Sequence, residues 1–187
     1  MRSRSAPRKL EGEDELYNAA LRALMRRAHS IHEMKEYLAR RVDEPGKDLV
    51  PPVIARLREQ KYLDDARYAL DYARAHAQSR RQGRFRIARE LRARGIPDQL
   101  IEAALASVFA ETDESALARV RIKRALARVH GPLERRKVAS IYRSLLAAGF
   151  SADVIRAELR AATSDALAAG SPDLADATEA TDSTADS

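Results

Sequence analysis

Two stretches of the sequence share one pattern: residues 87–105 are IARELRARGIPDQLIEAAL, and residues 141–159 are IYRSLLAAGFSADVIRAEL. Seven positions of the first stretch superimpose on the second at a constant offset of 54. They are Ile87, Leu91, Gly95, Ile96, Leu100, Ile101 and Leu105, which match Ile141, Leu145, Gly149, Phe150, Val154, Ile155 and Leu159. In each stretch apolar residues recur at helical spacing on both sides of a glycine, which predicts two helices joined by a short turn.

The same helical spacing extends over most of the chain, and no sustained alternation of polar and apolar residues predicts a strand. Aromatic residues are scarce, at 5%, so a core of Leu, Ile, Val and Ala is expected. We therefore predict an all-α protein. Its nine expected helices lie at residues 15–28, 30–41, 50–60, 64–78, 83–94, 98–109, 113–129, 134–147 and 151–162.

The nine helices group into three tandem three-helix repeats, which resemble helix-turn-helix modules in outline. The first repeat carries the pattern more loosely, with Leu38, Val53 and Leu57 in equivalent positions and a longer turn at residues 42–52. The second and third repeats are aligned at their starts by an offset of 48, which places Asp65 on Asp113 and Tyr68 on Ala116. Small repeats bury little surface alone, so stacking into an elongated, curved molecule is expected. The predicted divisions are a flexible charged N-terminus at 1–14, repeats at 15–60, 64–109 and 113–162, and a disordered acidic tail at 163–187.

Several helix ends have a recognisable signature. Ser30 and Glu33 form an S-x-x-E capping box, and Ser151 stands where an N-cap is expected. Either Asp64 or Asp65 is expected to cap the helix that follows. Gly95 and Gly149 follow periodic runs, where a left-handed residue ends a helix. The tyrosines at positions 17, 68 and 72 are expected to pack in the core rather than to stack on bases.

Composition limits the classes of protein that the chain can be. There is no Cys, which excludes disulfides and thiolate sites and is compatible with the expected cytoplasmic location. The basic start is followed by an acidic stretch at 11–15, so no signal peptide is expected, and no stretch approaches the ~20 apolar residues of a membrane span. No phosphate-binding glycine motif, metal-ligand spacing or catalytic constellation is present, so we expect no cofactor, no metal and no enzyme. Histidines 29, 32, 76 and 130 are expected at the surface or in caps.

The net charge of +6 is unevenly distributed. Residues 163–187 contain six acids and no Lys or Arg, which leaves +12 on residues 1–162. Two basic clusters stand out, one at residues 74–94 with the single acid Glu90 and one at residues 119–137 with the single acid Glu134. Such density predicts binding to phosphates or to acidic side chains. The candidate binding residues are Arg80, Arg81, Arg84, Arg86, Arg89, Arg92, Arg121, Lys123, Arg124, Arg128, Arg135, Arg136 and Lys137.

Several stretches, in their order and spacing, resemble the RecX family of recombinase regulators. They are RAHSIHEM at 27–34, YLDDARY at 62–68, SRRQGR at 79–84, residues 87–96, and AGF at 148–150 with Val154 and Ile155. The chain departs from the family pattern at Lys61, where Gly is common, at Arg84, where Pro is frequent, and at Met34, where Leu is usual. The resemblance covers roughly residues 15–162 and implies tandem three-helix repeats.

The resemblance also implies a function. A RecX-type protein lies along the groove of the RecA filament on single-stranded DNA and inhibits its ATPase, strand-exchange and coprotease activities, which modulates recombinational repair and the SOS response. The implied partners are the RecA filament and, secondarily, single-stranded DNA, and a monomer is expected. We expect the arginine clusters to supply the attraction, and the acidic tail to compete for the basic face.

Two other functions fit the residues alone. A free-standing DNA-binding protein, architectural or regulatory, would use the same positive charge without a recombinase partner. A helical adaptor for a protein unrelated to DNA would bind through its concave face and show little affinity for nucleic acid.

Overall fold

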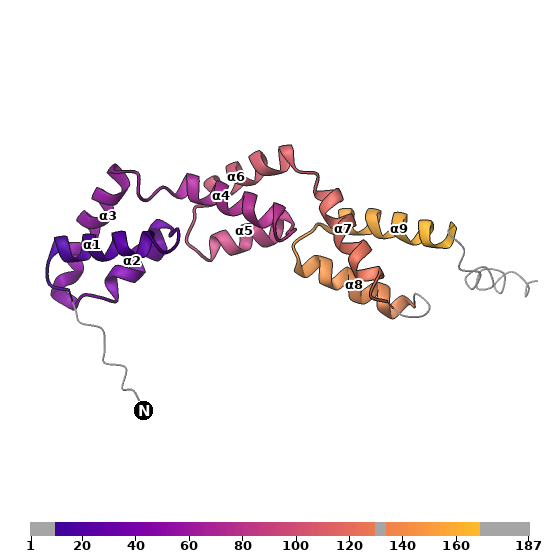
Figure 1. The fold of residues 1–187 in the computed structure, drawn as a ribbon, viewed down its shortest axis with the longest axis horizontal. Helices are drawn as coiled ribbons and strands as arrows, with labels where there is room; N and C mark the ends of the chain where they lie inside the picture. The colour runs from indigo at the N-terminus through magenta and orange to yellow at the C-terminus, as the bar shows by residue number, and fades with distance from the viewer. Residues whose placement is uncertain (1–9, 130–133, 169–187) are drawn as a thin grey trace, which may run out of the picture. The chain divides into compact units, whose positions relative to one another are not determined.

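The computed structural model describes residues 10–129 and 134–168, and this part of the chain is all-helical (Figure 1). It contains nine α-helices, one short 3-10 helix and no strand. The elements are α1 (Glu13–Leu24), α2 (Ile31–Ala39), η1 (Glu44–Leu49), α3 (Val50–Glu59), α4 (Asp65–Gln78), α5 (Arg84–Arg92), α6 (Asp98–Glu111), α7 (Glu114–Leu126), α8 (Arg135–Ala147) and α9 (Ala152–Ala168). The predicted fold class is confirmed, and each α-helix begins within two residues of its predicted start.

The last helix is longer than predicted. We expected it to end at residue 162, but α9 continues to Ala168. The Thr163 hydroxyl donates to the carbonyl of Leu159 at 2.9 Å, so its polar group is satisfied within the helix. Alanine, the best helix former, is frequent in this stretch. The prediction that the tail begins at Thr163 is therefore wrong, and residues 169–187 of the expected tail lie outside the described residues.

The chain divides into two compact units. Unit 1 comprises residues 1–75 and 88–108, and unit 2 comprises residues 76–87 and 109–187. The boundaries of the three repeats and the elongated shape stay predictions.

In unit 1, helices α1, α2 and α3 enclose an aliphatic core (Figure 1). Leu16, Met34, Leu38 and Leu57 are fully buried at its centre. Tyr17 packs against this core, as predicted, and its hydroxyl donates to the side-chain carbonyl of Gln60. The looser copy of the repeat pattern therefore forms a closed three-helix cluster.

In unit 2, helices α7, α8 and α9 enclose a second core. Ala118, Ile122, Phe150 and Ile155 are almost completely buried in it. Phe150 directly follows Gly149, whose φ of +91° is the left-handed conformation predicted for the end of α8. The sharp turn at Gly149 thus places Phe150 in the core.

A first joint, within unit 1, connects the start of α2 to α4 and to the end of α5. Ser30 forms the predicted capping box with Glu33, and its hydroxyl also donates to the carbonyl of Arg94 at 2.6 Å. The Asp65 carboxylate accepts the backbone N–H of Ile31 at 2.9 Å. Gly95, with a φ of +73°, lies so close to the His32 side chain that a Cβ on it would stand 2.4 Å from the His32 Cβ.

A second joint, within unit 2, repeats this arrangement. The Glu114 carboxylate accepts the backbone N–H of Arg84, the first residue of α5, at 3.0 Å. The next amide, that of Phe85, donates to the carbonyl of Gly149 at 3.1 Å, and the amide of Gly83 donates to that of Ala148 at 2.9 Å. Carboxylates and carbonyls from a neighbouring helix pair therefore satisfy the otherwise unpaired N–H groups at the start of α5.

The joints correct the alignment of the repeats. The Asp64 side chain caps α4 by accepting the amides of Ala66 and Arg67, while Asp113 caps α7. Asp65, in the first joint, thus corresponds to Glu114, not to Asp113. The expected offset of 48 between the repeat starts is wrong by one residue, because α4 and α7 begin 49 residues apart.

Replacing Ser30 by Ala should lower the free energy of unfolding by about 2 kcal/mol. The substitution removes an N-cap, which costs about 1 kcal/mol, and leaves the Arg94 carbonyl without its buried donor, which costs about 1 kcal/mol more. Urea unfolding followed by circular dichroism measures the change. Ser140→Ala, at an exposed position of α8, is the control and should change stability by no more than about 0.5 kcal/mol. Equal stability of the two variants would contradict the role of Ser30 in the joint.

Candidate anion-binding interface

Five arginines line a cleft of about 260 Å³ in unit 2. We call it the arginine cleft, and its arginines are Arg80, Arg81, Arg121, Arg124 and Arg128. The remaining lining residues are Ala125, Ile141, Ser144 and Leu145. None of these nine lining residues is acidic, so the cleft has one sign of charge.

The arginines of the cleft come from two segments in different parts of the chain. Arg121, Arg124 and Arg128 recur at intervals of three and four residues, the spacing that places side chains on one face of a helix. Arg80 and Arg81 lie in the turn between α4 and α5, where Arg81 has a left-handed φ of 49°. The fold thereby brings two arginines of the first predicted cluster next to three arginines of the second.

Arg121 holds the two segments together. Its Nη1 donates to the carbonyl of Arg80 at 2.9 Å and to the carbonyl of Arg81 at 3.1 Å. Burial lowers the pKa of the Arg121 guanidinium, and the nearby positive charges of Arg86, Arg81 and Arg124 lower it further. Like charges held together out of water destabilise one another, and a bound anion relieves that repulsion.

Three of the predicted binding residues contact other parts of the protein, and these contacts give each of them a structural role. The Arg84 Nε lies 2.9 Å from Glu114, the Arg92 Nε lies 2.5 Å from Asp98, and the Arg86 Nη1 donates to the carbonyl of Ala147 at 3.4 Å. The acids Glu114 and Asp98 lie outside the cluster at 74–94, so counting acids within that cluster missed them. Arg84 chiefly supports the start of α5.

The remaining candidates do not line the arginine cleft. Arg89 is exposed and belongs to unit 1, whereas Lys123 is exposed on α7. The first turn of α8 consists of Arg135, Arg136 and Lys137, where positive charges meet the positive end of the helix dipole. The structure therefore separates the thirteen predicted residues into five that line the cleft, three that are structurally paired and five that lie elsewhere.

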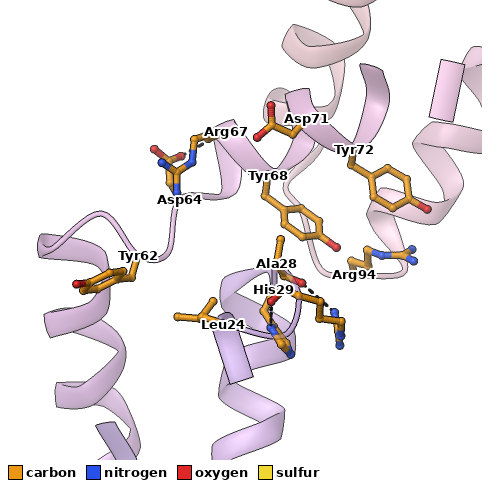
Figure 2. Close-up of a pocket in the computed structure, with 11 residues that line it drawn as sticks. Leu24, Ala28, His29, Tyr62, Asp64, Arg67, Tyr68, Asp71, Tyr72 and Arg94 are labelled. Carbon is orange, nitrogen blue, oxygen red and sulfur yellow. Dashed lines mark hydrogen bonds between the residues drawn. The ribbon is translucent and has the colours of Figure 1, made fainter. Parts of the chain in front are cut away.

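Unit 1 contains a larger open pocket of about 530 Å³ (Figure 2). Figure 2 shows Tyr68 and Tyr72 projecting from α4 on the side of Ala28 and Arg94. The two rings stack with centroids 6.1 Å apart, and the Arg94 guanidinium lies 4.6 Å from the Tyr72 ring centroid. The tyrosines thus pack, as predicted, but at the wall of an open pocket rather than in a closed core.

The two tyrosine hydroxyls at the wall of this pocket are satisfied by the protein itself. The Tyr72 hydroxyl donates to Glu90 at 2.5 Å, and the Tyr68 hydroxyl donates to Glu33 at 3.4 Å. Asp64 and Asp71 add negative charge to the lining, so the pocket has both signs. The arginine cleft is therefore the better candidate for an anion.

The histidines differ from the prediction. His29 and His76 are buried, not exposed, and their Nδ1 atoms contact the carbonyl of Arg27 at 2.9 Å and the side chain of Gln82 at 2.7 Å. Burial lowers the pKa of His29, and the charge of Arg27 lowers it further. His32 is exposed, and His130 lies outside the described residues. No group of three potential ligands in the described residues is placed to hold a metal ion.

Comparison with known proteins gives the family. Residues 64–105 match the RecX second three-helix domain. Over 149 residues the chain is 42% identical to the regulatory protein RecX of Halorhodospira halophila, a match that covers 79% of this chain and 88% of that relative. This chain belongs to the RecX family. It is 32% identical over 143 residues to the regulatory protein RecX of Bacillus subtilis, covering 76% of this chain and only 53% of the longer relative.

A crystal structure of RecX from Lactobacillus salivarius has the same fold. Its TM-score is 0.68 at 26% sequence identity, and the match covers 79% of this chain and 94% of that one. The expected RecX membership is therefore confirmed, and with it a regulatory role as the family name states. The RecX domain match at 64–105 includes Arg80 and Arg81 of the arginine cleft. None of the described helices is both long enough and apolar enough to cross a membrane.

Proposed function

We propose that this protein is a negative regulator of the RecA recombinase. It binds the filament that RecA forms on single-stranded DNA and inhibits the ATPase, strand-exchange and coprotease activities of that filament. By doing so it modulates recombinational DNA repair and the SOS response. RecX membership supports the regulatory role, and the arginine cleft is the observation that carries the mode of binding.

A filament of protein on DNA presents phosphates and acidic side chains at regular intervals, and both are ligands for guanidinium groups. Charge-assisted bonds from arginine to such groups are about twice as strong as neutral hydrogen bonds. Arg80, Arg81 and Arg124 have no acidic partner in the described part of the chain, so they can contact the filament without breaking an ion pair. The protein acts by binding, as a monomer in the cytoplasm, and needs neither a cofactor nor catalysis.

A second function, free-standing DNA binding, would use the same cleft. Phosphates of bare DNA satisfy guanidinium groups as well as those of a filament, and affinity would then depend on DNA and salt alone. The two functions differ in stoichiometry, because a DNA coat must cover the substrate and a filament regulator need not.

The experiment is the ATPase rate of the cognate RecA on single-stranded DNA, with this protein added far below the RecA concentration. We expect inhibition at substoichiometric amounts, where too little protein is present to cover the DNA. Bare-DNA binding is measured at the same salt concentration. If the ATPase rate falls only when this protein saturates the DNA, competition for DNA explains the inhibition and the proposed function is wrong.

A further inference from the structure

We infer that the arginine cleft is also the docking site for the acidic C-terminal segment of this same chain, residues 169–187. Docking of this segment competes with external anions and so restrains binding to the filament. The inference rests on the proposed function only for what it regulates, because the contact between segment and cleft is a property of the isolated chain.

Arg80, Arg81 and Arg124 of the cleft have no acidic partner among the described residues. Arg121 is fixed by its two bonds to the carbonyls of Arg80 and Arg81, so its position is set before any ligand arrives. Around it, Arg80 and Arg124 are exposed, and Arg81 is half-buried. The guanidinium of Arg121, held in place by the two carbonyls, loses little conformational entropy when it binds a carboxylate.

The segment carries only the opposite charge. Residues 169–187 contain five acids and no Lys or Arg. The acids are Asp173, Asp176, Glu179, Asp182 and Asp186, which recur at intervals of three or four residues. Arg121, Arg124 and Arg128 recur at the same intervals. A segment laid across the cleft would therefore bring several carboxylates within reach of its guanidinium groups.

The connection to unit 2 makes this contact intramolecular. The segment follows α9, which packs against α7, the helix that bears Arg121 and Arg124. An extended chain spans up to about 3.5 Å per residue, so the segment reaches about 60 Å. The 13 residues of α7 extend only about 20 Å. A tethered ligand has an effective concentration of about 1 mM or more, so contacts too weak to hold a free peptide tightly still occupy the cleft.

The test compares the full-length chain with a tail-neutral variant of the same length, D173N/D176N/E179Q/D182N/D186N. The probe is fluorescently labelled inorganic polyphosphate, whose binding is followed by anisotropy at fixed salt. We expect the tail-neutral variant to bind about five- to ten-fold more tightly, because the competing carboxylates are gone.

The tail-neutral substitutions are also made in two variant chains, which show whether the cleft is responsible for the gain in affinity. Adding R80A/R81A/R124A should abolish the gain, since the segment then has no site from which to be displaced. The charge-matched control R22A/R26A/R58A removes three exposed arginines of unit 1 and should keep the gain. An equal gain in both backgrounds would overturn the inference, because it would reflect net charge alone.

A direct measurement needs no recombinase. A labelled peptide with the sequence of residues 169–187 is titrated with the full-length tail-neutral chain. We expect saturable binding that the R80A/R81A/R124A substitutions remove and the R22A/R26A/R58A substitutions retain. Absence of binding, or binding equal in all variants, would overturn the inference even if the chain inhibits RecA. Conversely, peptide binding without RecA inhibition would overturn the proposed function and leave the docking site.

Discussion

Replacing Gly149 by Ala is expected to lower the free energy of unfolding of unit 2 by about 3 kcal/mol. The backbone at this residue is left-handed, with a φ of +91°, which costs about 1–2 kcal/mol for alanine. An added Cβ would also lie 2.3 Å from the backbone nitrogen of Arg86. Relief of that clash separates the two turns of the second joint and weakens the bonds that Gly83 and Phe85 donate, each worth about 1 kcal/mol.

Thermal and urea unfolding of the purified chain measure this loss, which corresponds to a fall of about 6–12 °C in Tm. Gly12→Ala is the matched control, because a Cβ at Gly12 meets nothing within 4 Å and the residue has an extended φ of −126°. The control should change stability by less than about 1 kcal/mol. Similar losses in both variants would show that the second joint does not need a glycine at position 149.

The helices could be predicted from the sequence because their signals are local. The capping box of Ser30 and Glu33 and the left-handed glycines 95 and 149 each depend on a few neighbouring residues. The joints could not be predicted in the same way. Glu114 caps a helix that begins at Arg84, 30 positions earlier, and no periodic pattern relates a carboxylate to an amide at that distance.

The candidate site could be predicted only as two clusters of charge. Counting charged residues along the sequence cannot show that Arg84 pairs with Glu114, because folding brings the two residues together. Nor does it show that Arg121 turns inward to bind two carbonyls of the turn at Arg80 and Arg81. The buried state of His29 was missed for the same reason, since its burial is made by folding and no local pattern marks it.

The structure therefore changes which substitutions test the site. From the sequence, replacing Arg80, Arg81, Arg84 and Arg89 together would weaken filament binding. Arg84, however, supports the start of α5, and Arg89 belongs to unit 1. A set confined to the cleft, in which each side chain lacks an acidic partner among the described residues, separates binding from folding.

The triple variant R80A/R81A/R124A should bind the RecA filament about 30- to 100-fold more weakly at low salt. Each lost contact at such an exposed surface is worth about 0.7–0.9 kcal/mol, so the three together contribute about 2–2.7 kcal/mol. The salt dependence should also flatten, with the slope of log K against log salt concentration falling by about 2, because about 0.7 counterion is released per phosphate of a single strand. Anisotropy of labelled filaments across a salt series measures both quantities.

The control for this variant is R22A/R26A/R58A, which removes the same net charge from exposed positions outside both basic clusters. If long-range attraction to the net charge governed binding, the two variants would lose affinity equally, and their salt slopes would fall together. If the cleft binds, only the first variant loses most of its affinity, while both keep the stability of the parent chain because none of the six arginines is buried in a core. Equal losses of affinity would show that Arg80, Arg81 and Arg124 are ordinary solvated surface residues. The binding face would then lie elsewhere on the chain.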